Sequence, residues 1–479
     1  MLRKLGQSEF GIYSLAASVI SYLTLFNFGF SNALIRYTAK FRAEGQEEKQ
    51  RQLFGLCLKL YTLIGILAFA IGLILFFNVD WIFDRTMTPE ELYQIRVIVL
   101  ILVFNLAITF PFSVFGGIIS AYEEFVFQKT INIARVFLNT LVMVLLLSMG
   151  YKAITMVIVQ TVFNLITLFL NYFYCKRFLH VKFSFKKVDF SFLKEIAIYS
   201  FWIFLESIMD RIYFSTGQFV LGALVGAVAV AIFSLGLHFQ SFYISFSTAI
   251  SGVFLPRVTR MATEKNSEKD ISDLFIRTGR IQHIVMAFII SGFIVFGQPF
   301  IYLWAGPGYE VSYIITLIFF LSQFTPLIQN LGLTILQARN QLMFKGIMYV
   351  VVAVISLVAQ IYLSKLWGSI GCALAIGGGV FISQGIILNW YYWKKQKIDI
   401  PQFWIEIFKM SIIPIIFSLI GYILVKQFNC YSALNLLIAA SLYTVFYIPM
   451  FYKFSLNHYE KGLFIQPIKK LSNKIFRRA

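Results

Sequence analysis

One stretch of the chain reads Val97-Ile-Val-Leu-Ile-Leu-Val-Phe-Asn-Leu-Ala-Ile-Thr-Phe-Pro-Phe-Ser-Val-Phe-Gly-Gly-Ile-Ile119 and contains no charged residue. A helix of this length rises roughly 1.5 Å per residue, enough to cross the roughly 30 Å hydrocarbon core of a bilayer. The same apolar pattern recurs and predicts about thirteen spanning helices joined by short connections. They cover residues 10–35, 53–79, 97–119, 130–149, 155–175, 195–221, 227–255, 281–303, 312–336, 346–364, 369–392, 408–427 and 432–452.

The composition of the whole chain also indicates a membrane protein. Of 479 residues, 59% are apolar and 13% are charged, whereas a soluble domain has roughly 45–50% apolar and about 25% charged residues. So few charges exclude a cytosolic enzyme, a nucleic-acid-binding module, a disordered chain and a secreted disulfide scaffold. The four cysteines are scattered without a CxxC pair, so neither a disulfide framework nor a zinc site is expected. The predicted fold class is an all-α polytopic membrane protein.

The basic residues are distributed unevenly between the connections. The chain has 41 Lys and Arg against 22 Asp and Glu, a net charge of +19. Alternate connections hold 32 of the basic residues, and the opposite ones hold seven. Because basic loops stay in the cytoplasm, this asymmetry predicts the orientation and a cytoplasmic C-terminus. Anionic membrane lipids, rather than nucleic acid, are the expected partners of the charge. The basic connections are 36–52, 120–135, 176–195, 256–280, 337–345, 393–409 and 453–479.

The start of the chain does not fit this orientation, because it places the basic residues Arg3 and Lys4 on the side of the membrane away from the cytoplasm. A repeat offers an explanation: Gly6–Leu15 aligns with Gly226–Leu235, and each copy has a glycine turn, a long span and a basic exit. The second copy follows span 195–221, whose counterpart would precede Met1. We therefore expect a first helix to be missing relative to the repeat. The alternative is a chance similarity between two apolar stretches.

Duplicated halves are a recurrent transporter design in which the substrate site lies at the interface of the halves. The predicted organisation has an N-terminal bundle over 1–175 and a C-terminal bundle over 195–392. Two additional spanning helices over 408–452 and a basic cytoplasmic tail over 453–479 follow.

Several short motifs resemble one protein family. They are Leu5-Gly-Gln-Ser-Glu-Phe-Gly-Ile-Tyr-Ser-Leu15, Phe28-Gly-Phe-Ser-Asn-Ala-Leu-Ile-Arg-Tyr37, Gly217-Gln-Phe-Val-Leu-Gly222 and Phe254-Leu-Pro-Arg257. Together they resemble the bacterial polysaccharide (O-antigen) flippases of the multidrug/oligosaccharidyl-lipid/polysaccharide (MOP) exporter superfamily. The resemblance implies two pseudo-symmetric bundles around a central cavity, in the bacterial cytoplasmic membrane. It also implies transfer of an undecaprenyl-pyrophosphate-linked oligosaccharide to the outer leaflet, with polysaccharide assembly proteins as further partners.

Charged residues inside a span are costly and are functional candidates by default. Glu206, Asp210 and Arg211 lie near the middle of span 195–221. The two carboxylates are four residues apart and share a helix face, and Arg211 lies about 100° further round. A guanidinium there is suited to bind pyrophosphate, and the carboxylates are suited to hold a coupling Na⁺ or H⁺. The alternative is a permanent ion pair that joins two helices.

Lys59 and Arg135 lie several residues inside their spans and are further candidates for binding the phosphates. Their long side chains can also extend to the membrane surface, which is the simpler explanation for Lys59. His238 is expected to be a bonded core residue rather than a proton relay. Uncharged amides in the spans can bond sugar hydroxyls, although bonds between helices are commoner; they are Asn105, Asn139, Gln160, Asn164, Gln218, Gln240, Asn330, Gln360 and Gln384.

The leading hypothesis is therefore a flippase that performs no catalysis and needs no cofactor or metal beyond a coupling ion. The sequence has no GxxxxGK[ST] motif, so ATP hydrolysis is not expected. Two alternatives remain. A cation-coupled multidrug antiporter of the same superfamily would suit the acidic pair Glu206 and Asp210. A membrane glycosyltransferase or polymerase would need catalytic groups in large outer loops, of which residues 80–94 form the longest.

Overall fold

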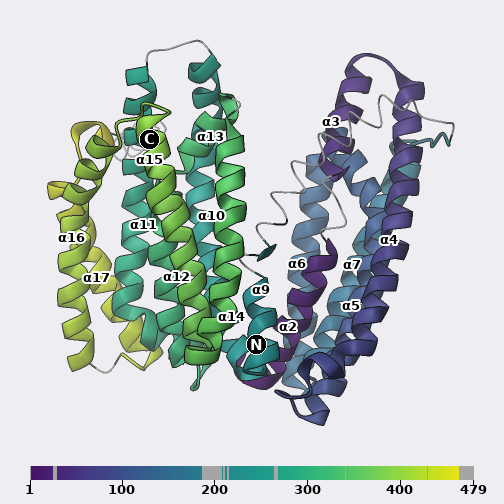
Figure 1. Cartoon of the computed structure of the whole chain (residues 1–479), viewed down its shortest axis with the longest axis horizontal. Coiled ribbons are helices and arrows are strands. Elements are labelled where there is room, and N and C mark those ends of the chain that lie inside the picture. Colours follow the sequence, from purple (N-terminus) through teal and green to yellow (C-terminus); the bar gives the residue numbers. More distant parts are fainter. Residues whose placement is uncertain are drawn as a thin grey trace, which may run out of the picture. The chain divides into compact units, whose positions relative to one another are not determined.

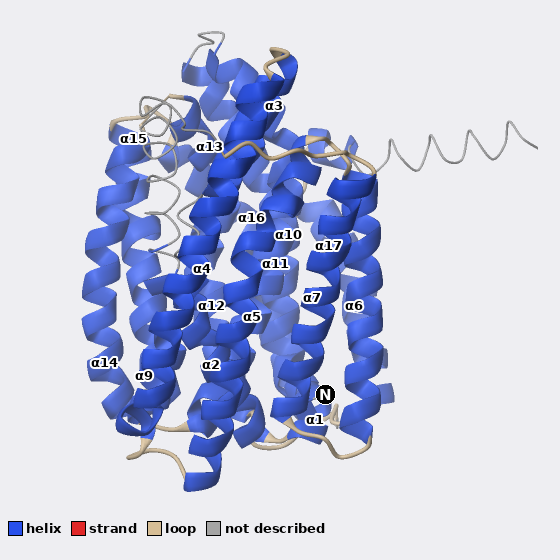
Figure 2. Cartoon of the chain, turned by 90° about the vertical axis from the view of Figure 1, so that its right-hand side faces the viewer, coloured by secondary structure: helices blue, strands red, loops and turns tan. Residues whose placement is uncertain are grey.

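The computed structural model describes residues 2–24, 30–185, 208, 211–212, 215–263, 268–339, 341–428 and 430–462. These residues form helices joined by short connections and contain no strand (Figure 2), which confirms the predicted all-α fold class. The helices are α1 (Leu2–Leu5), α2 (Gln7–Leu23), α3 (Phe30–Ala43), α4 (Glu47–Phe83), α5 (Pro89–Ala121), α6 (Phe125–Ser148), α7 (Ala153–Arg177), α9 (Thr216–Leu224), α10 (Ala227–Thr263), α11 (Glu268–Ala305), α12 (Glu310–Ile328), α13 (Asn330–Ala338), α14 (Leu342–Val380), the π-helix η2 (Phe381–Ile387), α15 (Leu388–Lys394), α16 (Ile400–Gln427) and α17 (Ala433–Phe454).

Ten segments of the described chain are long and apolar enough to cross a membrane. Three differences separate this number from the predicted thirteen spans. Predicted span 10–35 contains α2, which is only 17 residues long. Span 195–221 lies mostly outside the described residues. Spans 346–364 and 369–392 fall within one continuous helical segment, Met343–Lys394.

That continuous segment is a helical hairpin. Trp367 (φ −128°) and Gly368 (φ 55°) interrupt the helix within α14. Glycine adopts such a positive φ at no steric cost, which explains its place in the turn. Ser356 Oγ donates to the carbonyl of Ala375 at 3.0 Å, so the two arms run antiparallel. The two separate spans predicted here are therefore present.

The chain forms two compact units. Unit 1 comprises residues 1–234 and 357–372, and unit 2 comprises residues 235–356 and 373–479. In each unit we call the helix ends beside the basic connections the basic side, and the other ends the opposite side.

In unit 1, α5 packs against α2, α3, α4 and α7 (Figures 1 and 2). Gly65 of α4 lies directly against the Ala107 carbonyl of α5, and Gly72 lies against Val103, because small residues let membrane helices approach closely. The basic side of unit 1 has a buried core where α3, α4, α5 and α7 meet. Its large members include Tyr37, Phe41, Phe54, Tyr61, Phe110, Phe115, Ile118 and Ile119.

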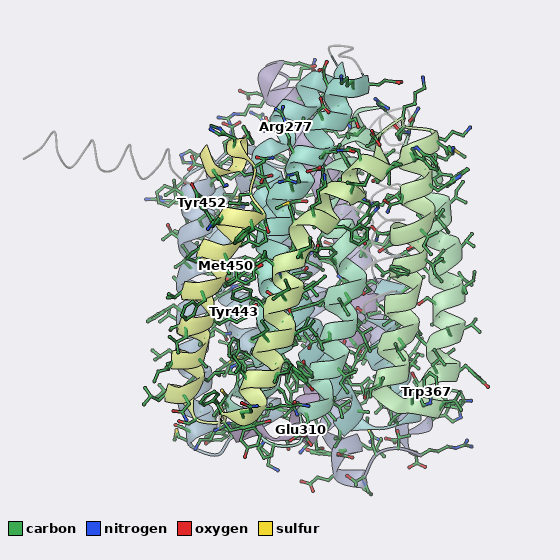
Figure 3. All side chains as sticks on the ribbon, turned by 90° about the vertical axis from the view of Figure 1, so that its left-hand side faces the viewer. Arg277, Glu310, Trp367, Tyr443, Met450 and Tyr452 are labelled. Carbon is green, nitrogen blue, oxygen red and sulfur yellow. The ribbon has the colours of Figure 1, made fainter. Side chains whose placement is uncertain are left out.

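In unit 2, α11 is the central helix and packs against α12, α13, α16 and α17. Tyr443 of α17, labelled in Figure 3, contacts the rings of Phe288 of α11 and Phe417 of α16. Arg277 and Glu310 in the same view mark the basic and opposite sides of this unit. The last two spanning helices are thus packed into unit 2 by aromatic side chains.

Both glycine turns of the sequence repeat are present. Gly6 has φ 86° and immediately precedes α2, and Gly226 has φ 117° and immediately precedes α10. The two turns lie in unit 1, where a Cβ on Gly11 of α2 would collide with the carbonyl of Ala227 at the start of α10. The matching turns support the alignment of the two copies.

Candidate functional site

Helix α7 carries a line of uncharged polar side chains at membrane depth. Gln160, Asn164, Thr167 and Asn171 are spaced by four, three and four residues. At about 100° per residue they fall within an arc of roughly 60° on one face of the helix. The exposed apolar side chains of α7 lie on the other face and are Ile158, Val162, Ile166, Phe169, Leu170 and Phe173. Because lipid suits only the apolar face, the polar face must border water, protein or a polar ligand.

Hydrogen bonds join this polar face to α5. Asn164 Nδ2 donates to Asn105 Oδ1 at 2.6 Å and to Thr109 Oγ1 at 2.8 Å. Asn105 Nδ2 donates in turn to Thr161 Oγ1 at 3.2 Å. The interhelical bonding expected for Asn105 and Asn164 is therefore confirmed.

The same face is joined to α2 by Tyr13, whose hydroxyl donates to Gln160 Oε1 at 2.9 Å. Gln218 of α9 likewise donates to Ser234 Oγ of α10, at 2.7 Å. By contrast, the Asn139 amide contacts Met143 Sδ of its own helix. We call the side chains of α2, α5 and α7 that meet here, Tyr13, Asn105, Thr109, Gln160, Asn164, Thr167 and Asn171, the polar face of unit 1.

Glu9 holds the opposite side of the polar face together. Its carboxylate accepts hydrogen bonds from Gln94 Nε2 of α5 at 2.8 Å and from the backbone N–H of Ala153, the first residue of α7, at 3.1 Å. Lys152 Nζ lies 3.3 Å away. A carboxylate is favourable at a helix N-terminus. This acidic residue of the Leu5–Leu15 motif therefore fixes the packing of α2, α5 and α7.

Arg211 is half-buried in unit 1, beside α2. Its guanidinium interacts electrostatically with Tyr22, whose hydroxyl is bonded to Thr216 Oγ1. Glu206 and Asp210, predicted to share its site, lie outside the described residues. Their grouping with Arg211 stays a prediction.

Lys59 of α4 has a local partner. Its Nζ donates to the carbonyl of Phe185 at 3.3 Å and lies 5.1 Å from the centre of that ring. Segment 181–185 is docked on α4 here, with Ser184 N donating to the Arg51 carbonyl at 3.0 Å. Gly55 makes this docking feasible, because a Cβ there would collide with the carbonyl of Ser184.

Arg135 of α6 is half-buried and donates to Asn132 Oδ1, one turn earlier, at 3.0 Å. That bond within one helix leaves its role as a substrate ligand untested. His238 of α10 has an exposed side chain. The expectation that His238 is a core residue is therefore wrong.

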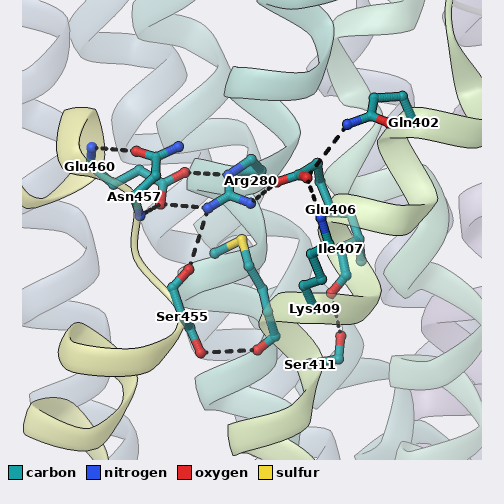
Figure 4. A network of polar contacts seen from close by, with 10 residues as sticks. Arg280, Gln402, Glu406, Ile407, Lys409, Ser411, Ser455, Asn457 and Glu460 are labelled. Carbon is teal, nitrogen blue, oxygen red and sulfur yellow. Dashed lines mark hydrogen bonds and ion pairs between the residues drawn. The ribbon is translucent and has the colours of Figure 1, made fainter.

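A charged cluster on the basic side of unit 2 is absent from the sequence predictions (Figure 4). Arg280 of α11 donates from Nε to Glu460 Oε1 at 2.6 Å and from Nη1 to Glu406 Oε2 of α16 at 2.6 Å. Glu460 is itself fixed by a hydrogen bond from the backbone N–H of Asn457 at 2.9 Å. From the sequence, Arg280 and Glu406 are expected in the basic connections 256–280 and 393–409. Both residues lie inside helices, α11 and α16, and no local spacing in the sequence indicates that they pair.

Unit 2 also contains an apolar pocket of about 620 Å³ between α11, α16 and α17 on the opposite side. Its lining includes Phe296, Phe417, Leu424, Ile438, Leu442 and Phe446. A second pocket of about 470 Å³ shares Val295, Val425 and Phe428 with the first and adds the polar groups of Gln298, Tyr422 and Lys426. The combination of an apolar pocket and a polar mouth suits part of a lipid.

Comparisons with solved structures show the fold. The inward-closed conformation of the lipid II flippase MurJ matches with a TM-score of 0.72 at 16% identity, over 94% of this chain and 95% of that chain. An inward-facing multidrug resistance MATE family transporter of the MOP superfamily matches with a TM-score of 0.64 at 13% identity, over 84% and 94% of the two chains. A MOP superfamily transporter from Pyrococcus furiosus matches with a TM-score of 0.54 at 13% identity, over 83% and 89%.

Sequence comparison assigns the family. No curated protein sequence matches the chain. The profile of the family described as "Polysaccharide biosynthesis protein" matches residues 1–262, more than half of the chain. The match includes α2, α5 and α7, which carry the polar face of unit 1. The chain therefore belongs to the polysaccharide biosynthesis protein family and has the fold of the MOP transporters.

Proposed function

We propose that this protein is a flippase that moves an undecaprenyl-pyrophosphate-linked oligosaccharide from the inner to the outer leaflet of the bacterial cytoplasmic membrane. The observation that carries the proposal is the polar face of unit 1, an uncharged hydrogen-bonding surface on three packed helices at membrane depth. A hydrophilic head group needs such a surface, since hydrocarbon offers it no hydrogen bonds. Family membership and the fold support the same function.

The lipid chain and the pyrophosphate of the substrate need different surroundings, and different regions of the protein are suited to each. The lipid chain stays in the bilayer, and the apolar pocket of unit 2 is suited to hold part of it. The pyrophosphate is an acceptor-only anion, so we assign it to cations, with Arg211, Arg135 and Lys59 as candidates. Arg211 is the strongest of these, because it is half-buried beside α2 and a guanidinium binds phosphate in a bidentate manner.

No covalent step is needed for this task. Transport follows when the protein alternates between states open to one leaflet or the other, while the head group crosses without meeting hydrocarbon. Glu206 and Asp210 are the candidates for coupling this change to Na⁺ or H⁺, because a carboxylate can be neutralised by either ion.

The test is to replace Arg211 by Ala and to measure surface polysaccharide in cells. We expect export to fall at least tenfold while the amount of protein in the membrane is unchanged, because the pyrophosphate loses its charged partner. Arg85→Ala is the matched control, since Arg85 is exposed in the connection after α4. Normal export by Arg211→Ala would contradict this role. Drug efflux without any effect on glycan export would favour the antiporter.

A further inference from the structure

Several hydrogen-bonding groups of the polar face have no protein partner. Gln160 accepts a bond from Tyr13 through Oε1, but its Nε2 bonds to no residue that the structure describes. Asn164 donates twice through Nδ2, yet its Oδ1 accepts nothing within the described chain. Asn171 is half-buried and makes no hydrogen bond to any described residue. This helix face therefore presents a free donor at Gln160, a free acceptor at Asn164 and both kinds of group at Asn171.

Leaving these groups unpaired against lipid is unfavourable. Gln160 is exposed and Asn164 and Asn171 are half-buried, so their unpaired groups can reach a ligand, whereas hydrocarbon could not supply the missing bonds. The three residues span eleven positions, roughly 16 Å along the helix axis. A face of this length and spacing can contact more than one unit of an extended polar ligand.

The absence of charge narrows the ligand class. Residues 10–23 of α2, 97–121 of α5 and 153–175 of α7 contain no Asp, Glu, Lys or Arg. Phosphate oxygens only accept hydrogen bonds, so the free carbonyl oxygen of Asn164 would repel them. A hydroxyl both donates and accepts, and it can pair with either end of an amide. The face therefore matches a hydroxyl-rich, uncharged ligand.

We propose that Gln160, Asn164 and Asn171 form a subsite for the neutral sugars of the transported glycan, separate from the cations that hold the pyrophosphate. This inference rests on the proposed function and assigns it a substrate class. Gln160 and Asn171 contact the glycan without holding α7 to α5, whereas Asn164 also carries the interhelical bonds to Asn105 and Thr109. The first two residues are thus the ones to substitute.

The experiment measures binding of two probes to the full-length protein in lipid nanodiscs. One probe is undecaprenyl pyrophosphate, and the other is the same lipid with a trisaccharide of neutral hexoses. We expect the wild type to prefer the glycosylated probe. Asn171→Leu and Gln160→Leu should each weaken binding of that probe about threefold to tenfold and leave binding of the bare lipid unchanged, because each removes groups assigned to the sugars. Gln160→Leu also removes the bond from Tyr13, so Asn171→Leu is the cleaner of the two variants.

Two control variants distinguish a sugar subsite from a general loss of binding. Phe169→Leu, on the apolar face of α7, should change neither affinity. Arg211→Ala should weaken both probes equally if the pyrophosphate assignment holds. Equal losses of both probes in the Asn171 and Gln160 variants, no loss in either, or equal wild-type affinity for the two probes would overturn the sugar subsite. A wild type that binds neither probe would instead count against the flippase function itself.

Discussion

Arg280 is held between two carboxylates in a part of unit 2 that is almost closed to solvent. The exposed fraction is 6% for the Arg280 side chain and 2% for that of Glu460. Burying such charges is expensive unless every group is paired, and here the guanidinium also donates to the Ser455 carbonyl at 3.3 Å. The cluster fixes the chain after α17 onto α11 and α16.

Replacing Arg280 by Met should lower the free energy of unfolding by about 3–5 kcal/mol, because Glu460 is then left buried without a partner. Denaturant unfolding in mixed micelles measures the change. The double variant Arg280→Met with Glu460→Gln should recover part of the loss, since the uncompensated charge is gone. Arg277→Met is the control at an exposed position of the same helix. A loss for Arg280→Met no larger than for Arg277→Met would show that the cluster does not stabilise this end.

Neither this cluster nor the role of Glu9 can be predicted from the sequence. Glu406 is 126 residues from Arg280 and Glu460 is 180 residues away, so no local spacing pairs them. Glu9 meets Ala153 over a separation of 144 residues. The polar residues of α7 are different, since their spacing along one helix is visible in the sequence. The sequence does not show, however, which of these polar groups bond to other helices and which have no protein partner.

Among the elements, hydropathy predicted most of the spanning helices, because a bilayer imposes both length and apolar composition. The sequence predicts the turn of the α14 hairpin as a gap between two spans, and Gly368 lies in that turn. The docking of segment 181–185 on α4 has no signal in the hydropathy pattern. Lys59 was predicted from its depth in the span, whereas its partner lies in a loop 126 residues later.

Gly55→Ala should detach segment 181–185 from α4, because the added Cβ meets the Ser184 carbonyl rather than a flexible side-chain end. In a Ser184→Cys background, the rate of thiol labelling should rise about tenfold or more. The four native cysteines are buried and should contribute little background. Gly346→Ala is the matched control, since nothing lies within 4 Å of its Cβ position. An unchanged labelling rate in Gly55→Ala would mean that the segment does not depend on this close approach.

For the whole molecule, composition established a membrane protein, and the sequence motifs led to the family that the profile match confirms. The distribution of Lys and Arg predicts the orientation, which a labelling experiment on either side of the membrane can test. Substrate class is beyond composition, because it depends on which side chains the folded helices place together. The sugar subsite on the polar face is our proposal, argued from that placement of side chains.

Transport by purified protein tests the central claim most directly. Proteoliposomes would carry a fluorescent undecaprenyl-pyrophosphate-linked trisaccharide of neutral hexoses, and a membrane-impermeant quencher would report how much remains in the inner leaflet. We predict that wild-type protein exposes nearly all of the probe to the quencher, whereas vesicles with Arg211→Ala behave like protein-free vesicles, in which about half stays protected. Folded wild-type protein that moves the probe no faster than protein-free membranes would contradict the account.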